Sequence, residues 1–168
     1  MNQNGRDRKM YTVEIIKKNE FECNWITLFI GRKFKLISSQ EVTNYAVNHL
    51  ENNPNIKNEN ILELAWEQTE EKVDSLLEQI VSDGSSEVMN REYHKWLYSV
   101  LKDIYINSSD DMVFSDIENI FFMFNSPEHM HNFFRTVSDA FYYPSDSEYT
   151  VKELLKEFLE TEKQIILN

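Results

Sequence analysis

Hydrophobic residues recur at three- and four-residue spacing along most of the chain, which is the period of a helix with one buried face. Short polar stretches separate these segments, and the whole chain holds only 3 glycines and 3 prolines. The pattern predicts a mainly α fold, a single-domain helical bundle of about seven or eight helices. The predicted helices cover residues 24–30, 38–50, 58–66, 69–83, 85–104, 115–124, 126–141 and 150–159.

Several predicted helix ends carry residues that can satisfy the free backbone groups there. Serine or threonine followed three residues later by glutamate is the spacing of a capping box, and it occurs at Ser38 with Glu41, Ser115 with Glu118 and Thr150 with Glu153. Ser126 before Pro127 predicts a further N-cap, because proline is favoured at the first helical position. Gly84 follows the 69–83 segment, where a left-handed C-terminal cap is expected.

The beginning of the chain is less regular. Tyr11, Val13 and Ile15 alternate as in a strand, so a short N-terminal strand remains open. Residues 1–10 are polar, and we expect them to form a flexible leader that is basic from Arg6 to Lys9. No signal-peptide hydrophobic region follows, and no stretch reaches the ~18 apolar residues of a membrane span. We therefore expect a cytoplasmic protein without membrane contact.

The composition excludes several common classes of site. Gly5, Gly31 and Gly84 lie too far apart to build a glycine-rich phosphate-binding loop. Cys23 is the only cysteine, which excludes an internal disulfide and any zinc site with two or more thiolates.

Charge is distributed unevenly along the chain. The formal net charge is −12, but residues 1–35 hold eight basic and four acidic residues, whereas residues 36–168 hold nine and 25. The larger part is therefore strongly anionic. Such a surface repels phosphate backbones, so we expect no direct nucleic-acid binding. A basic protein is the partner that this charge favours, with solubility as the ordinary alternative explanation.

The acidic residues concentrate in one predicted helical region. We refer to Glu63, Glu67, Glu70, Glu71, Asp74 and Glu78 as the acidic cluster. Like charges four residues apart destabilise a helix by roughly 0.2–0.5 kcal/mol per pair, so the arrangement calls for a reason. We predict that the acidic cluster binds the partner, the alternative being a plain solvated helix face. Tyr142, Tyr143 and Tyr149 flank a second acidic loop and add weaker support for a binding surface.

No catalytic constellation stands out. A metal site needs three or four converging ligands, and the four histidines are His49, His94, His129 and His131. On a helix, His129 and His131 would point about 200° from one another, because each residue turns the helix by roughly 100°. Cys23 precedes a predicted helix start, where a thiol pKa can fall, but no pattern supplies a base for it. We predict no catalytic residue, no metal site and no cofactor.

Some segments resemble a known bacterial family. The residues are Asn24-Trp25-Ile26-Thr27-Leu28-Phe29-Ile30-Gly31, Leu36-Ile37-Ser38, Val42 with Tyr45-Ala46, and Leu62-Glu63-Leu64-Ala65-Trp66. Over residues 20–80 their order resembles the family named "domain of unknown function 2247". The resemblance implies a small, mainly helical, single-domain protein, and it carries over no functional residue.

These observations lead to one functional expectation with two alternatives. We expect a non-enzymatic acidic binding protein, in particular an immunity protein that neutralises a cognate bacterial toxin with carboxylates in place of phosphates. A small enzyme would instead use His94 or His129 with a nearby acid in a pocket. A helical scaffold or regulatory module would present an apolar groove to a partner helix.

Overall fold

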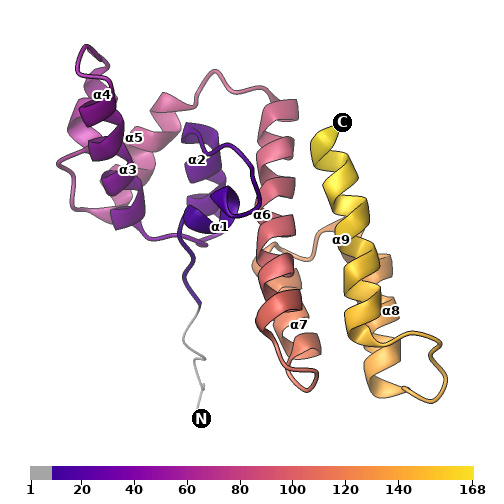
Figure 1. Ribbon diagram of the computed structural model, residues 1–168. Coiled ribbons are helices and arrows are strands. Elements are labelled where there is room, and N and C mark those ends of the chain that lie inside the picture. Colours follow the sequence, from indigo (N-terminus) through magenta and orange to yellow (C-terminus); the bar gives the residue numbers. More distant parts are fainter. Residues whose placement is uncertain (1–8) are drawn as a thin grey trace, which may run out of the picture. The chain divides into compact units, whose positions relative to one another are not determined.

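The computed structural model describes residues 9–168, and within them it contains nine α-helices, one 3-10 helix and no strand (Figure 1). The mainly α fold class is therefore confirmed. None of the described helices is both long and apolar enough to cross a membrane. The elements are α1 (Glu14–Lys17), α2 (Trp25–Lys33), α3 (Ser39–Asn52), α4 (Glu59–Leu64), α5 (Glu70–Ile80), α6 (Ser86–Asn107), α7 (Val113–Met123), η1 (Glu128–Met130), α8 (His131–Tyr142) and α9 (Val151–Leu167).

Contacts divide the chain into two compact units. The first unit ends at Glu92 and the second runs from Tyr93 to Asn168, so the boundary falls inside the long helix α6. Residues 1–8, which include Arg6 and Arg8 of the expected basic leader, lie outside the described residues.

The sequence pattern allowed a short strand near the N-terminus. That alternative is wrong, because Glu14–Lys17 form helix α1. Tyr11 N–H donates to the Leu36 carbonyl at 2.7 Å, but the chain then turns on itself, and Ile16 N–H donates to the Val13 carbonyl. Val13 and Ile16 are both buried. Residues three apart share one side of a helical turn and would face opposite sides of a strand, so burial of this pair favours the turn.

In the first unit, α4 and α5 pack on each other and on α3, and α5 also packs on α2. Each helix turns its apolar face inward, as the spacing predicted. Fully burying one such side chain stabilises the folded state by roughly 1.5–3 kcal/mol, so the shared core contributes much of the stability of this unit. The buried residues include Leu28, Val42, Ala46, Leu64, Val73, Leu76 and Leu77.

Arg32 is a charged residue within this core, only 8% exposed. Its Nε and Nη2 donate to the two carboxylate oxygens of Asp74 in α5 at 2.7 and 2.9 Å. Nη1 donates to the Ile37 carbonyl at 2.9 Å, and Nη2 also donates to Glu70. Hydrogen bonds to the Asp74 and Glu70 carboxylates outweigh burial and raise the pKa of Arg32. The guanidinium therefore remains charged and ties α2 to α5 through a bidentate pair.

The second unit is built around stacked phenylalanines. α7 packs on α8, and α8 packs on α9. The rings of Phe121 and Phe134 stack with centroids 4.2 Å apart, and those of Phe114 and Phe141 stack at 4.4 Å. α7 and α8 therefore form a phenylalanine-rich helical hairpin, in the region where the sequence predicted helices over residues 115–124 and 126–141.

Two of the predicted capping boxes begin helices as expected. Thr150 and Glu153 form the complete reciprocal box at the start of α9. Ser38 Oγ accepts from the Glu41 N–H at the start of α3, but the Glu41 carboxylate accepts from the Val13 N–H instead of closing the box. A long-range contact has therefore replaced half of a local motif.

The predicted N-caps at Ser115 and Ser126 are wrong. α7 begins at Val113, whose N–H donates to the Ser109 carbonyl, so the helix is already under way at Ser115. Asn125 and Ser126 have φ values of 61° and 51°. Their N–H groups donate to the carbonyls of Phe122 and Phe121, which is the pattern of a Schellman C-cap. Ser126 thus ends α7, and a separate turn, η1, precedes α8.

Gly84 does not form the predicted left-handed cap, since no described glycine has a positive φ. Gly84 instead lies where there is little room for a side chain. A Cβ at this position would lie 2.8 Å from Met89 Cε and 3.1 Å from the Val81 carbonyl oxygen. A side chain here would make Met89 move and would crowd the Val81 carbonyl, so the junction between α5 and α6 favours glycine.

Replacing Arg32 by methionine keeps most of the volume and removes the hydrogen bonds to α5. We expect Arg32→Met to lower the free energy of unfolding by about 2 kcal/mol, because hydrogen bonds to charged groups contribute roughly 1.5–3 kcal/mol and the freed carboxylates regain water. Urea unfolding followed by circular dichroism measures this. The neighbouring exposed residue offers the control, and Lys33→Met should change stability by less than about 0.5 kcal/mol. Equal losses in both variants would contradict the assignment.

The same interaction should appear in the pH dependence of stability. The hydrogen bond from Arg32, and then its charge, lower the pKa of Glu70 from the ordinary value of 4.5. The folded state thus binds this proton more weakly than the unfolded state, so the contribution is present above about pH 4.5 and is lost as pH falls through the folded pKa. We expect Glu70→Gln to be less stable than the unchanged protein at neutral pH, with a difference that shrinks below about pH 4.5. Urea unfolding curves over this range test it, and a constant difference would count against it.

Candidate functional site

The structure gives four of the six acidic-cluster residues contacts within their own unit. Glu70 and Asp74 pair with Arg32, and Glu63 lies 3.3 Å from Lys72 Nζ. Glu67 Oε1 accepts hydrogen bonds from the Thr69 N–H and hydroxyl, which cap the turn before α5 and lower the pKa of Glu67. Glu67, Glu70 and Asp74 therefore have structural roles, whereas the Glu63 pair is exposed on both sides and contributes little. The predicted role of these carboxylates in partner binding stays a prediction.

The remaining two carboxylates, Glu71 and Glu78, are exposed on α5 and form no ion pair within residues 9–168. Nearby in the chain, Trp66 is 85% exposed and Leu62 is 41% exposed. The sequence pattern had placed Trp66 at the end of a predicted helix over residues 58–66. Because α4 ends at Leu64, the chain turns before Trp66 and leaves its ring at the surface.

A different cluster lies in the second unit, where three segments bring His94 of α6, His129 of η1 and Glu162 of α9 together. His94 Nδ1 lies 2.6 Å from Glu162 Oε2, and His129 Nε2 lies 3.5 Å from Glu162 Oε1. One ligand atom from each residue lies within 4.8 Å of the other two. We refer to these three residues as the His–Glu cluster.

Burial differs sharply within the His–Glu cluster. Glu162 is 1% exposed and His94 is 7% exposed, whereas the His129 side chain is 35% exposed. The Tyr93 ring contacts the rings of His94, His129 and Phe124 edge-on, with centroids 5.2 to 5.8 Å apart. The cluster is therefore enclosed by aromatic rings and reaches solvent through His129.

The pKa values respond to this enclosure. Burial lowers the pKa of His129, the negative charge of Glu162 acts against that shift, and His94 adds a smaller lowering. Burial also raises the pKa of Tyr93, with a further contribution from Glu162. His129 is therefore a neutral imidazole at neutral pH, with one nitrogen lone pair available to accept a proton or bind a metal ion.

Sequence reasoning considered His94 and His129 separately and missed Glu162. The two partners of Glu162 lie far away in the chain, 68 residues away for His94, so no local spacing could reveal them. One signal was present. Glu162 occupies the buried stripe of α9 together with Leu155, Leu159 and Ile166. A carboxylate at a core position needs a compensating partner, and that observation could have identified the residue.

The other candidate residues lie elsewhere. His131 Nε2 lies 2.9 Å from the Ser126 carbonyl oxygen, which agrees with the prediction that it does not act with His129. His49 packs against the rings of Trp25 and Tyr45. Burial raises the pKa of Cys23 to about 11, so this thiol is protonated and unreactive at neutral pH despite preceding a helix.

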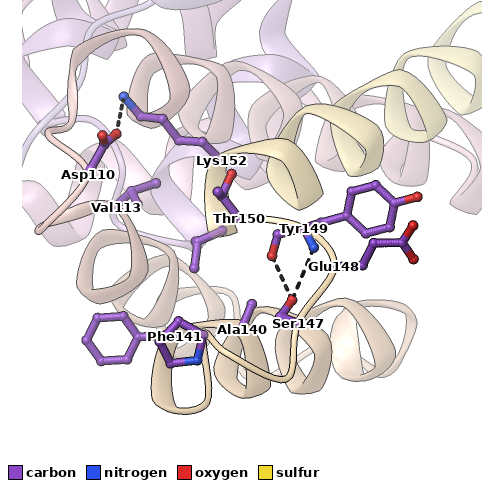
Figure 2. Close-up of a pocket in the computed structure, with 11 residues that line it drawn as sticks. Asp110, Val113, Ala140, Phe141, Ser147, Glu148, Tyr149, Thr150 and Lys152 are labelled. Atoms are coloured by element: carbon purple, nitrogen blue, oxygen red, sulfur yellow. Dashed lines mark hydrogen bonds and ion pairs between the residues drawn. The ribbon is translucent and has the colours of Figure 1, made fainter.

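A surface pocket of about 360 Å³ lies between the residues before α7, the end of α8 and the start of α9 (Figure 2). Lys152 Nζ and Asp110 Oδ1 bridge it at 3.3 Å, and Glu148 also lines it. Its lining includes no histidine, so it is not the histidine and carboxylate pocket that an enzyme was expected to use. Nearby, Tyr142, Tyr143 and Tyr149 are more than half exposed.

Comparison with known proteins places the chain in a family. A model described as "Uncharacterized protein conserved in bacteria (DUF2247)" matches residues 13–163. The chain belongs to this family. The DUF2247 match confirms the resemblance seen over residues 20–80, extends it through most of α9, and includes both the acidic cluster and the His–Glu cluster. No curated protein and no solved structure matches the chain.

Removing the buried carboxylate should destabilise this DUF2247 protein. Glu162→Ala leaves His94 without its hydrogen-bond partner and opens a cavity, so we expect the free energy of unfolding to fall by about 3 kcal/mol. Glu162→Gln keeps an acceptor for His94 and should cost less. Urea unfolding measures both, with Glu157→Ala on the exposed face of α9 as the control. Equal stability of the Glu162→Ala variant and the control would contradict a buried partner for His94.

Proposed function

We propose that this DUF2247 protein is a non-enzymatic acidic binding protein whose partner is a basic protein. The observation that carries the proposal is Trp66, which is 85% exposed within the acidic cluster sequence. Tryptophan is highly buried on average, and it is among the residues most enriched at binding hot spots. An almost fully exposed tryptophan therefore favours a surface that a partner covers.

The surroundings of Trp66 match an interface with an apolar anchor and a polar rim. Leu62 adds exposed apolar surface next to it in the chain. Glu63 and Glu67 flank it in sequence, the first paired with Lys72 and the second held by the Thr69 turn. Interfaces bury their aromatic anchors centrally and keep charged groups at the edge, where they guide approach.

Charge supports a basic protein as the partner. The chain has a formal net charge of −12. Complementary charge raises the association rate of a basic protein, whereas it disfavours nucleic acids, whose phosphates would be repelled. Within the acidic cluster we assign the partner contacts to Glu71 and Glu78, because both are exposed on α5 and can meet a cation without breaking the Arg32 pairs.

The more specific proposal is that the partner is a bacterial toxin domain and that this protein is its immunity protein. A small acidic protein from a bacterial family suits that role, since carboxylates can occupy a cationic site that would otherwise hold phosphates. The exposed tyrosines Tyr142, Tyr143 and Tyr149 offer additional adaptable contact area of the kind found at interfaces.

The proposal predicts a toxin gene beside the gene for this protein, and co-expression with the encoded toxin tests it. We expect the unchanged protein to protect cells, Trp66→Ala to weaken binding about 30-fold by calorimetry, and Glu71→Lys with Glu78→Lys to slow association and abolish protection. The matched control is Glu157→Lys with Glu160→Lys, which reverses the same amount of charge on exposed positions of α9. It should protect normally.

Two outcomes would reject the proposed surface. Full protection by both the Trp66→Ala variant and the doubly reversed α5 variant would show that the partner binds elsewhere. Equal loss of protection in the α5 and α9 charge variants would show that total charge matters and that this surface does not.

A further inference from the structure

We propose that His94, His129 and Glu162 form a Zn²⁺-binding site in the second unit. The inference goes beyond the proposed function, because it requires neither a partner nor the acidic cluster. It rests on ligand chemistry, on the distances within the His–Glu cluster and on the burial of its carboxylate.

The ligand set is one that zinc uses. Two histidines and one glutamate supply three protein ligands, and water or another ligand completes a tetrahedron. One potential ligand atom of each residue lies within 4.8 Å of the others. The three residues come from α6, η1 and α9, so the ion would join three segments of the unit. The partial exposure of His129 supplies the path by which an ion enters.

The separations are close to those that zinc requires. With zinc–nitrogen and zinc–oxygen lengths of about 2.0–2.2 Å, two ligand atoms of a tetrahedral site lie roughly 3.4 Å apart. His129 Nε2 and Glu162 Oε1 are 3.5 Å apart, which is too long for a good hydrogen bond and suits two ligands of one ion.

The hydrogen bond between His94 and Glu162 must break before His94 can bind the ion. His94 Nδ1 and Glu162 Oε2 are 2.6 Å apart, which is the separation of a hydrogen bond. Binding through Nδ1 requires this nitrogen to be unprotonated, so that His94 carries its proton on Nε2 and exchanges its hydrogen bond to Oε2 for a bond to the ion.

Burial gives the ion a physical role. Glu162 is 1% exposed, and an ionised carboxylate taken out of water needs full compensation. A divalent cation held by this carboxylate and the two imidazoles would supply the positive charge that balances it. Phe124 and Tyr93 provide the apolar enclosure that keeps competing water from such a site.

Titration calorimetry of the chelator-treated full chain with ZnCl₂ tests the site. We expect one equivalent of Zn²⁺ to bind with a dissociation constant below about 1 μM and to raise the melting temperature. His129→Ala should weaken binding at least about 30-fold, and because this side chain is partly exposed the variant remains folded, as circular dichroism will verify. Glu162→Gln, which retains an acceptor for His94, should weaken it similarly.

His131→Ala is the matched control, since it removes a histidine two residues from His129 that does not belong to the cluster. This variant should bind Zn²⁺ as the unchanged protein does. Substitution with Co²⁺ should give the strong visible absorption of a four-coordinate site in the control and not in His129→Ala.

The proposal is overturned if the unchanged chain binds no Zn²⁺ below about 100 μM, or if His129→Ala and Glu162→Gln bind as tightly as the control. Several weak equivalents that are the same in every variant would also overturn it, because they would reflect surface carboxylates. None of these results bears on the Trp66 surface, which the toxin assay tests separately.

Discussion

The cost of removing a charged group from water governs both regions to which a role has been assigned. In the first unit Arg32 meets this cost with Asp74, Glu70 and the Ile37 carbonyl. In the second unit Glu162 meets part of it through the hydrogen bond with His94, with His129 3.5 Å away. Hydrophobic packing turns the apolar face of each helix inward. The buried charges add a constraint, because an incorrect pairing would leave one of them without compensation.

This constraint changes how the acidic cluster is interpreted. In the sequence, the run of carboxylates predicts one anionic surface. In the structure, its members have different roles. Glu70 and Asp74 balance a buried cation, Glu67 caps a turn, and Glu71 and Glu78 remain exposed. The repulsion between neighbouring carboxylates is therefore offset locally by Arg32. The surplus charge that a partner could use is smaller than the composition suggests and lies on fewer residues.

What sequence reasoning could predict was local. The helical class followed from the spacing of residues such as Val73, Leu76 and Leu77, and the Thr150 capping box followed from two residues three apart. Four local predictions were wrong: the N-terminal strand, the N-caps at Ser115 and Ser126, and the left-handed cap at Gly84. The residue types at Ser126 suit both the end of one helix and the start of the next, and in the structure Ser126 ends α7. At Gly84 the nearby Met89 side chain limits the space, and the backbone is not left-handed.

The same distinction applies to the candidate sites. The acidic cluster was visible because its members are close in the chain, but the pairing of Asp74 with Arg32 spans 42 residues and was invisible. The exposure of Trp66 depended on where α4 stops, a boundary that propensity fixes poorly. The His–Glu cluster depended wholly on tertiary packing. The one sign of the His–Glu cluster in the sequence was Glu162, a carboxylate on the apolar stripe of α9.

The turn that carries His129 has a consequence for the whole second unit. Asn125 and Ser126 adopt left-handed backbone conformations that non-glycine residues adopt at a cost of order 1–2 kcal/mol each, and they do so just before η1. The packing of α7 on α8 must sustain that conformation. The left-handed pair thus places η1, and with it His129, beside Tyr93 and His94 of α6 and Glu162 of α9.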